Sequence, residues 1–419
     1  MFGDRRLTTV WTMACIGSGR LCARVEKLCQ LGHNLQARRK ASFVKFKELN
    51  LHQNARILPE SCQAGRRAPG YSRHCRAISS MRTQQPGSQP QPQSVDPYVL
   101  LYDDLKHIYE DIREELQKNT KIPELQSIAT YYFGGQGKAL RPMVAILMAR
   151  AINYHLYKEN SLLAPQRQVA MISEMIHSAS LIHDDVIDQS DIRRGKPSVN
   201  ALWNHKKVAM AGDFILAVAS MMIARLRNND VTLTLSQVVT DLVQGEFMQL
   251  GSKETENERF AHYLTKTYRK TASLIANSVK ATAMLAGADD ALAEVVFQYG
   301  RNVGLAFQLV DDLLDFVSSS DAMGKPTAAD LKLGLATAPV LFACEKYPEL
   351  NPMIMRRFQE PGDVERAFEL VHKSQGLEQT RFLARNHCIE AVRHASSLVE
   401  SPYQKGLTVI TDLVLNRMK

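Results

Sequence analysis

Apolar residues recur at intervals of three and four along most of the chain, and this spacing places them on one face of an α-helix. The first clear stripe joins Leu101, Leu105, Ile108, Ile112 and Leu116, with acidic residues between them. The same spacing predicts helices over residues 124–133, 139–156, 166–188, 207–227, 231–250, 258–285, 290–319, 327–346, 363–374, 378–399 and 404–417. Alternating runs and Asn-Gly turns, the usual signals of strands and hairpins, are almost absent.

Several of these predicted helices exceed twenty residues and are apolar on more than one face. Helices of that kind have to be surrounded by other helices. No repeat of 20–50 residues is evident, which argues against a solenoid. The longest nearly apolar run, Phe214–Ala224, has 11 residues between Asp213 and Arg225, so it favours a core helix over a membrane span. The sequence therefore predicts an all-α fold, a single large helical bundle.

The net charge of +9 comes from the first part of the chain. Residues 1–82 hold 16 Lys and Arg against 4 Asp and Glu, whereas residues 83–419 hold 36 against 39. An Arg-rich, acid-poor segment of this kind is typical of a mitochondrial transit peptide. We expect residues 1–82 to be one, with its cleavage point left open, and the protein to work in the matrix or on the inner-membrane face. The alternative, a basic tail that binds nucleic acid, gains no support from the acidic remainder.

A short Gln/Pro-rich segment separates the basic leader from the helical pattern. Residues 83–97 have no apolar periodicity and predict a disordered linker. Asp96 can cap a helix that begins with Pro97, so residues 98–419 form the expected helical domain. Only Cys344 and Cys388 lie in that domain, which fits a reducing compartment and no disulfide framework.

Two aspartate clusters interrupt apolar predicted helices, 127 residues apart. They consist of Asp184, Asp185 and Asp188, and of Asp311, Asp312 and Asp315. Carboxylates four apart share a helix face and repel, so something positive has to lie between them. Hard oxygen ligands used in pairs suit Mg²⁺ shared with substrate phosphates, whereas the alternating ligands of an EF-hand are missing. One cluster alone is more often solvated surface, but two on apolar helices favour a metal site.

Basic residues accompany both clusters. Lys138 and Arg141 begin a predicted helix, where the dipole disfavours cations unless both bind an anion. Arg193 and Arg194 follow the first cluster in a loop, and Lys270 lies on a long helix. Each alone is typical of a solvated surface. Together with the acidic clusters they predict a pocket for two diphosphates.

At this point the sequence resembles the trans-prenyl diphosphate synthases over most of residues 98–419. The motifs follow the family's order: GKALRP at 137–142, EMIHSASLIHDD at 174–185, DDVID at 184–188, RRG at 193–195, GEFMQL at 245–250, KTASL at 270–274, DDLLD at 311–315 and GKPTAADL at 324–331. The resemblance implies antiparallel helices around a central cavity, with the two aspartate motifs facing each other at its mouth. It also implies a long-chain prenyltransferase that serves the side chain of ubiquinone.

Site residues follow from the resemblance by position. Mg²⁺ would be held by Asp184, Asp188 and Asp311, with Asp185, Asp312 and Asp315 nearby. The allylic diphosphate would contact Arg193, Lys270, Thr271 and Gln308. Isopentenyl diphosphate would contact Lys138, Arg141, His177 and Arg194. Without the resemblance, a lone His such as His177 would more often be a core residue with satisfied hydrogen bonds.

The chemistry that the resemblance implies explains why no Ser/His/Asp or Cys/His set is found. Ionisation of the allylic diphosphate needs charge stabilisation on the leaving group, which Mg²⁺ and basic side chains supply, and no protein nucleophile. One position departs from the family pattern. Leu335 stands in Gly334–Pro339 where family members often have Lys, so a candidate cation is missing on the allylic side.

Product length is inferred from the helix that leads into the first cluster. Ala179 and Ser180, about one turn before Asp184, are small where short-chain relatives have aromatic residues, so elongation to about nine to ten units is expected. Small residues are also common packing devices between helices. The resemblance further implies a homo- or hetero-oligomer, the latter with a paralogous second subunit, and peripheral membrane contact through the lipid product.

Three other functions compete with this interpretation. A terpene cyclase would share the first aspartate motif but would have no use for an isopentenyl site. A non-catalytic partner subunit would have lost acidic or basic site residues, which this chain keeps. A shorter-chain, geranylgeranyl-type synthase would differ in product alone.

Overall fold

The computed structural model describes residues 95–134, 139–193, 195–251, 255–256, 258–317 and 328–418. The expected transit peptide at 1–82 lies outside these residues, as does the linker at 83–97 apart from its last three positions. Lys138 and Arg194, two of the expected substrate ligands, also lie outside them.

Helices make up nearly all of the described chain. The α-helices before the middle of the domain are α2 (Pro97–Leu100), α3 (Tyr102–Leu105), α4 (Ile108–Lys118), α5 (Pro123–Thr130), α6 (Leu140–Tyr157), α7 (Ala164–Ile187), α8 (Val199–Leu202), α9 (His205–Arg225) and α10 (Asn229–Leu250). Those after it are α11 (Arg259–Thr267), α12 (Ser273–Leu285), α13 (Asp290–Val317), α14 (Ala329–Lys332), α15 (Ala338–Ala343), α16 (Leu350–Met355), α17 (Asp363–Lys373), α18 (Gly376–Ala395) and α19 (Pro402–Leu415). Short turns are the 3₁₀ helices η1 (Tyr131–Phe133) and η4 (Asn416–Met418) and the π-helical η2 (Tyr268–Ala272).

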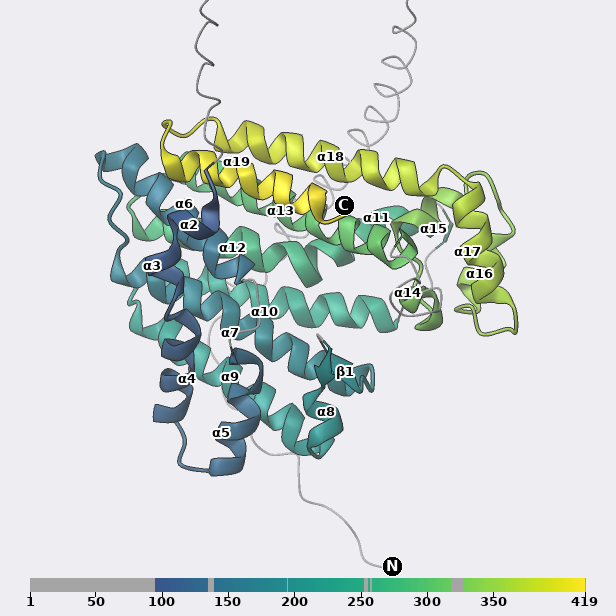
Figure 1. Cartoon of the computed structure of the whole chain (residues 1–419), viewed down its shortest axis with the longest axis horizontal. Coiled ribbons are helices and arrows are strands. Elements are labelled where there is room, and N and C mark those ends of the chain that lie inside the picture. Colours follow the sequence, from purple (N-terminus) through teal and green to yellow (C-terminus); the bar gives the residue numbers. More distant parts are fainter. Residues whose placement is uncertain are drawn as a thin grey trace, which may run out of the picture. The chain divides into compact units, whose positions relative to one another are not determined.

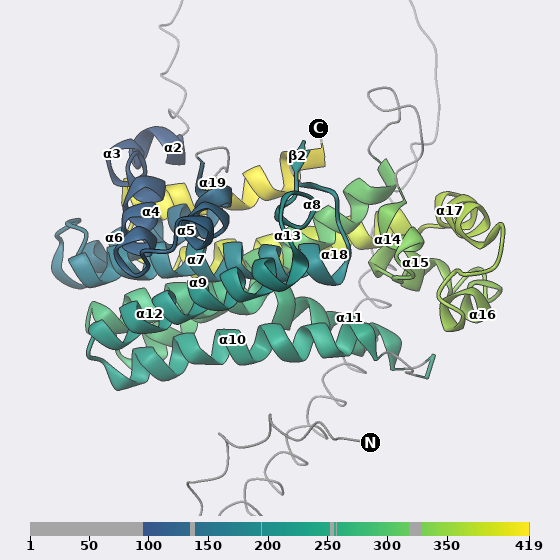
Figure 2. The same ribbon diagram turned by 90° about the horizontal axis from the view of Figure 1, so that it is seen from below.

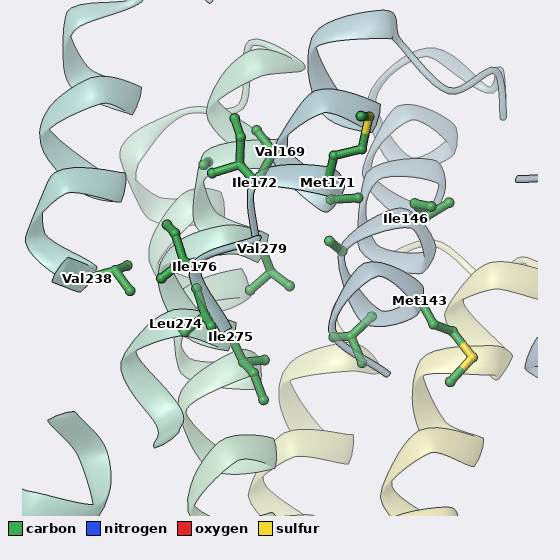
Figure 3. Close-up of a cluster of buried hydrophobic side chains, with 14 of the residues drawn as sticks. Met143, Ile146, Val169, Met171, Ile172, Ile176, Val238, Leu274, Ile275 and Val279 are labelled. Atoms are coloured by element: carbon green, nitrogen blue, oxygen red, sulfur yellow. The ribbon is translucent and has the colours of Figure 1, made fainter. Parts of the chain in front are cut away.

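The long helices lie side by side as a bundle, which confirms the all-α prediction (Figure 1). α13 packs against α12 and α18, and α7 packs against α6, α9 and α12. α14 to α17 gather at one end of the bundle, where they have a small hydrophobic core of their own (Figure 2). The main core lies where α6, α7, α10 and α12 meet (Figure 3). Its buried side chains include Ile146, Ile172, Ile176, Val238 and Val279.

Three local expectations were wrong. The stripe from Leu101 to Leu116 is divided between two short helices, α3 and α4, because Leu101 and His107 leave helical geometry, although its residues stay on the buried side or close to it. The helix expected over 327–346 is broken between α14 and α15, where Gly334 has a φ of +78°. The loop after α7 contains a small hairpin, in which β1 (Ile192–Arg193) pairs antiparallel with β2 (Lys196–Pro197). Local periodicity carries no information on such breaks.

Two glycines bring α13 close to the helical stretch that carries Lys270. A Cβ atom on Gly304 would lie 2.5 Å from the Cα of Ala272, and one on Gly300 would lie 2.7 Å from the Cα of Ala276. Contacts this short are excluded for any other residue. The glycines therefore set the distance between η2 and the helix that bears the second aspartate cluster.

α9 is the one helix in the described ranges that is long and apolar enough to cross a membrane, with a mean hydropathy of 1.7. Its inner residues, among them Val208, Ile215 and Val218, are buried in the main core, and the helix packs on α7. This packing agrees with the core helix expected from the run at 214–224. Its other face carries exposed methionines at 210 and 221.

Candidate active site

The first aspartate cluster lies at the C-terminal end of α7. Its middle member, Asp185, is engaged in contacts with other side chains of the protein. Asp185 is fully buried; Arg193 of β1 donates from Nε to its Oδ1 at 2.5 Å, and the hydroxyl of Tyr132 donates to its Oδ2. The same Tyr132 hydroxyl accepts from the amide of Val199 at 3.1 Å. These contacts fix the hairpin after α7 against η1, so Asp185 and Arg193 hold the rim of the site together.

The outer members of this cluster face further charges. Burial raises the pKa of Asp184 to about 6, and the carboxylates of Glu246 and Asp188 add to this rise, while Lys270 opposes it. Burial also raises the pKa of Asp188. The negative charge of Glu246 adds to this rise, and the positive charge of Lys270 opposes it. A carboxylate whose negative charge is disfavoured by burial and by neighbouring carboxylates is stabilised when a cation binds beside it.

Lys270 joins the first cluster to α10. Its amino group lies 2.5 Å from a carboxylate oxygen of Glu246 and donates to Oε1 of Gln249 at 3.2 Å. Gly245 permits this approach, because a Cβ atom there would lie 2.7 Å from Cγ of Lys270. Lys270 belongs to the π-helical turn η2, a feature frequent at functional sites.

A hydrogen-bonded chain runs from η2 to the second cluster. The hydroxyl of Thr271 donates to Oε1 of Gln308 at 2.9 Å, and Nε2 of Gln308 donates to Oδ1 of Asp312 at 3.0 Å. Tyr263 of α11 donates to the other oxygen of Asp312 at 2.5 Å. The α11–η2 stretch is therefore tied to both clusters, through Lys270 to the first and through Tyr263 and Thr271 to the second.

The remaining residues of the second cluster have separate partners. Asp315 accepts from the amides of Ala329 at 2.9 Å and Asp330 at 3.1 Å and so caps the start of α14. Asp311 pairs with Arg417 of η4 at 2.8 Å. Burial raises the pKa of Asp311 to about 6 against the effect of Arg417, and burial together with Asp312 and Asp315 raises the pKa of Asp330 to about 7.

The residues expected to bind isopentenyl diphosphate are described only in part. Arg141 lies in the first turn of α6, and its charge lowers the pKa of Asp311, so the start of α6 is close to the second cluster. His177 is half-buried on α7, two turns before Asp184. Of the two small residues expected to set product length, Ala179 is fully buried, and Ser180 donates to the carbonyl of His177 at 2.8 Å.

Five residues of the site were not assigned a role from the sequence. They are Tyr132, Glu246, Tyr263, Asp330 and Arg417. Glu246 and Asp330 lie inside quoted motifs, so the motifs contained the signal. Tyr132, Tyr263 and Arg417 reach the aspartates from elements distant in sequence, where no local pattern marks them.

The donor set can be compared with what Mg²⁺ requires. No three Asp, Glu, His or Cys side chains in the described part of the chain are close enough to hold an ion by themselves. Mg²⁺ is usually bound by one or two carboxylates together with substrate phosphates, and less often by an all-protein cage. Hard oxygen donors at the ends of α7 and α13, with elevated pKa values at Asp184 and Asp311, fit an ion of that kind.

Comparison with known proteins decides the family. Residues 122–371 match the family model described as polyprenyl synthetase. The chain belongs to this family. A human all-trans-polyprenyl-diphosphate synthase is 56% identical over 324 residues, which cover 77% of this chain and 78% of the human protein. The mitochondrial solanesyl-diphosphate synthase 1 of rice is 39% identical over 356 residues, 81% of this chain and 82% of the rice protein.

A solved structure supports the same assignment. A polyprenyl synthase from Caulobacter crescentus, complexed with calcium and isoprenyl diphosphate, is 29% identical with a TM-score of 0.69, over 78% of this chain and all of that one (100%). The expected fold and enzyme class are thus confirmed: this polyprenyl synthetase is a long-chain trans-prenyltransferase for the ubiquinone side chain. Its mitochondrial location agrees with that of relatives such as the rice enzyme.

Proposed function

We propose that the two aspartate clusters and the cations of the α11–η2 stretch form one site that adds isopentenyl diphosphate repeatedly to an allylic diphosphate such as farnesyl diphosphate. The observation that carries this proposal is the double connection of α11–η2. The positive charge of Lys270 lowers the pKa of Asp184 and Asp188, while Thr271 is connected to Asp312 by hydrogen bonds through Gln308. We infer a product of about nine to ten isoprene units, because Ala179 and Ser180 are small.

Within this site the side chains divide between the ion and the two substrates. Asp184, Asp188 and Asp311 would hold Mg²⁺, with Asp185, Asp312 and Asp315 fixing their surroundings. Bound Mg²⁺ supplies Lewis-acid stabilisation of the negative charge on the leaving diphosphate. The allylic diphosphate would contact Arg193, Lys270, Thr271 and Gln308. Isopentenyl diphosphate would contact Lys138, Arg141, His177 and Arg194.

In this reaction the side chains bind and stabilise charge and do not act as nucleophiles. The allylic carbon–oxygen bond breaks with its electron pair on the diphosphate, and the basic residues stabilise that charge. The isopentenyl double bond then attacks the allylic cation. Loss of a proton, for which the released diphosphate is the acceptor, restores an allylic diphosphate that is one isoprene unit longer. No side chain has to form a covalent bond with substrate.

The direct test is incubation of the purified full-length chain with isopentenyl and farnesyl diphosphates, with Mg²⁺ or with excess chelator, followed by mass analysis. We expect a ladder of polyprenyl diphosphates that ends near nine or ten units and needs Mg²⁺. A single cyclised hydrocarbon with no use of isopentenyl diphosphate would overturn the proposal in favour of a terpene cyclase. Products that stop at four units would assign a geranylgeranyl-type synthase.

We also propose that the enzyme works as an oligomer, either of identical chains or with a paralogous second subunit. The support comes from the outward faces of α9 and α10, which pack against each other and expose large apolar side chains. On α10 these are Leu233, Val243, Phe247 and Leu250. Patches of this kind mark protein–protein contacts.

Paired substitutions and light scattering test this contact. Leu233, which is 71% exposed on α10, changed to Glu should reduce the molar mass to that of one chain. Phe382, which is 56% exposed on α18, changed to Glu is the matched control and should leave the mass unchanged. Equal behaviour of the two variants would place the contact elsewhere. If the organism has the paralogue, we expect little long-chain product without it.

The finer points of location and processing belong to the same proposal. We infer a transit peptide at residues 1–82, a linker at 83–97 and the synthase domain at 98–419. The mature enzyme would lie in the matrix or on the inner-membrane face, with peripheral contact through its lipid product. Sequencing the N-terminus of the protein purified from mitochondria tests the first boundary.

A further inference from the structure

Lys266 of α11 lies between the two halves of the site. It follows Tyr263 by three residues and precedes Lys270 by four, a spacing that puts all three on one side of the α11–η2 stretch. Tyr263 donates to Asp312 at 2.5 Å, and Lys270 pairs with Glu246 beside Asp184. The cation at 266 is therefore placed between the contacts that reach the first cluster and those that reach the second.

The amino group of Lys266 is desolvated and has no carboxylate partner. Across the described residues it makes no ion pair and no hydrogen bond, and it lies over the ring of Tyr263, 5.9 Å from the ring centroid. Burial lowers the pKa of Lys266 against the opposing effects of Asp312 and Asp330, while the neighbouring charge of Lys270 also lowers it. Lys266 is half-buried, and an ammonium that loses part of its hydration without gaining a paired anion would be stabilised by a bound anion.

A cavity connects Lys266 with the position where the family pattern is broken. Lys266, Tyr263, Gly334 and Leu335 all line it. Gln249 lies on the same wall and accepts the hydrogen bond from Lys270. The side chain at 335 and the side chain at 266 thus approach the same space from different elements, the loop after α14 and α11.

We propose that Lys266 supplies the cation that is missing at Leu335. Its amino group contacts the allylic diphosphate, and then the released diphosphate, from the side of the second aspartate cluster. This inference rests on the proposed function. Its chemical role is that of the other basic residues of the site: a fixed positive charge beside the leaving group stabilises the charge that develops there. The reaction and its atom balance are unchanged.

Removal of the charge tests the contact. Lys266→Met should weaken binding of the unreactive thio analogue of farnesyl diphosphate, measured by calorimetry with Mg²⁺, about 10- to 100-fold, because hydrogen bonds to charged groups contribute about 1.5–3 kcal/mol. Binding of isopentenyl diphosphate should stay within about twofold, and Lys266→Arg should bind nearly normally. Lys280→Met is the matched control, since Lys280 pairs with Glu294 at 3.9 Å on another pair of helices.

Relocation of the charge separates a direct contact from a structural role. In Lys266→Met with Leu335→Lys, the amino group enters the same cavity from the other side, and most of the lost affinity should return. Unchanged affinity in Lys266→Met, no recovery in the double variant, or failure of Lys266→Met to fold would each overturn the inference. Wild-type protein that makes no polyprenyl diphosphate, even with the paralogous subunit added where the organism has one, would overturn the proposed function itself, which the product analysis described above detects separately.

Discussion

Asp184→Asn should make the ligand-free protein more stable at neutral pH. Asparagine keeps the size of the side chain but removes a charge that burial, Glu246 and Asp188 all disfavour. Most changes at a half-buried polar position lower stability. A gain at this one is the signature of a residue whose charge serves a ligand.

The size of the gain follows from the pKa. A rise from 3.8 to about 6 corresponds to about 3 kcal/mol at a pH well above 6. Asp184 is half-buried, and solvent screening reduces this figure, so we expect about 1–3 kcal/mol and a melting temperature about 2–5 °C higher. The folded protein keeps the proton up to a pH of about 6, whereas the unfolded chain loses it near 3.8, so wild-type stability falls as pH rises across this interval.

Thermal unfolding at a series of pH values provides the measurement. The advantage of asparagine should be near zero at about pH 4, grow up to about pH 6–7 and then stay constant. Mg²⁺ with inorganic diphosphate should reverse the order, because only the wild type gains stability from binding. Asp103→Asn is the control: Asp103 is 87% exposed and pairs with Lys106, so its change should bring no gain. A pH-independent gap, or a less stable Asp184→Asn, would refute the reasoning.

Four further variants test other parts of the site and fold. Lys270→Met should weaken the allylic substrate about 10- to 100-fold and Arg141→Met the isopentenyl substrate by a similar factor, measured by separate titrations; equal losses for both substrates would contradict the division. Ala179→Phe should shorten the product to about three or four units by mass analysis while sparing the first condensation, and full-length product would place the tunnel elsewhere. Gly304→Ala should lower the free energy of unfolding in urea by about 1–3 kcal/mol, whereas Gly134→Ala, whose added Cβ would lie 3.8 Å from its nearest neighbour, should not.

Periodicity alone predicted the long helices well, because their buried faces are continuous. The helix expected at 166–188 runs over Ala164–Ile187, and the one expected at 231–250 runs over Asn229–Leu250. It failed where a helix breaks without losing its buried stripe, as at His107. Such a break depends on packing against other elements, and a pattern of apolar positions is the same with or without it.

The sequence likewise indicated only some of the residues of the site. Charged residues that interrupt apolar helices stand out in the sequence, so both aspartate clusters and Lys270 were found from it. Partners that come from distant elements were not, since Tyr132 and Arg417 occupy ordinary positions in their own segments. Their contacts with Asp185 and Asp311 exist only because the bundle brings η1 and η4 to the aspartates.

The charges of this bundle fall into two groups that serve different ends. Asp185 with Arg193 and Asp363 with Arg356, at 2.5 and 2.6 Å, are paired in ways that hold segments together. Asp184, Asp330 and Lys266 are desolvated, and their pKa values move in the direction that disfavours their charged forms. Selection for stability alone would not retain charged residues whose charged forms are disfavoured by burial, because neutral replacements are better tolerated. These desolvated charges lie within or beside the quoted motifs, on α7, α11 and α14, and this placement argues that a charged ligand binds there.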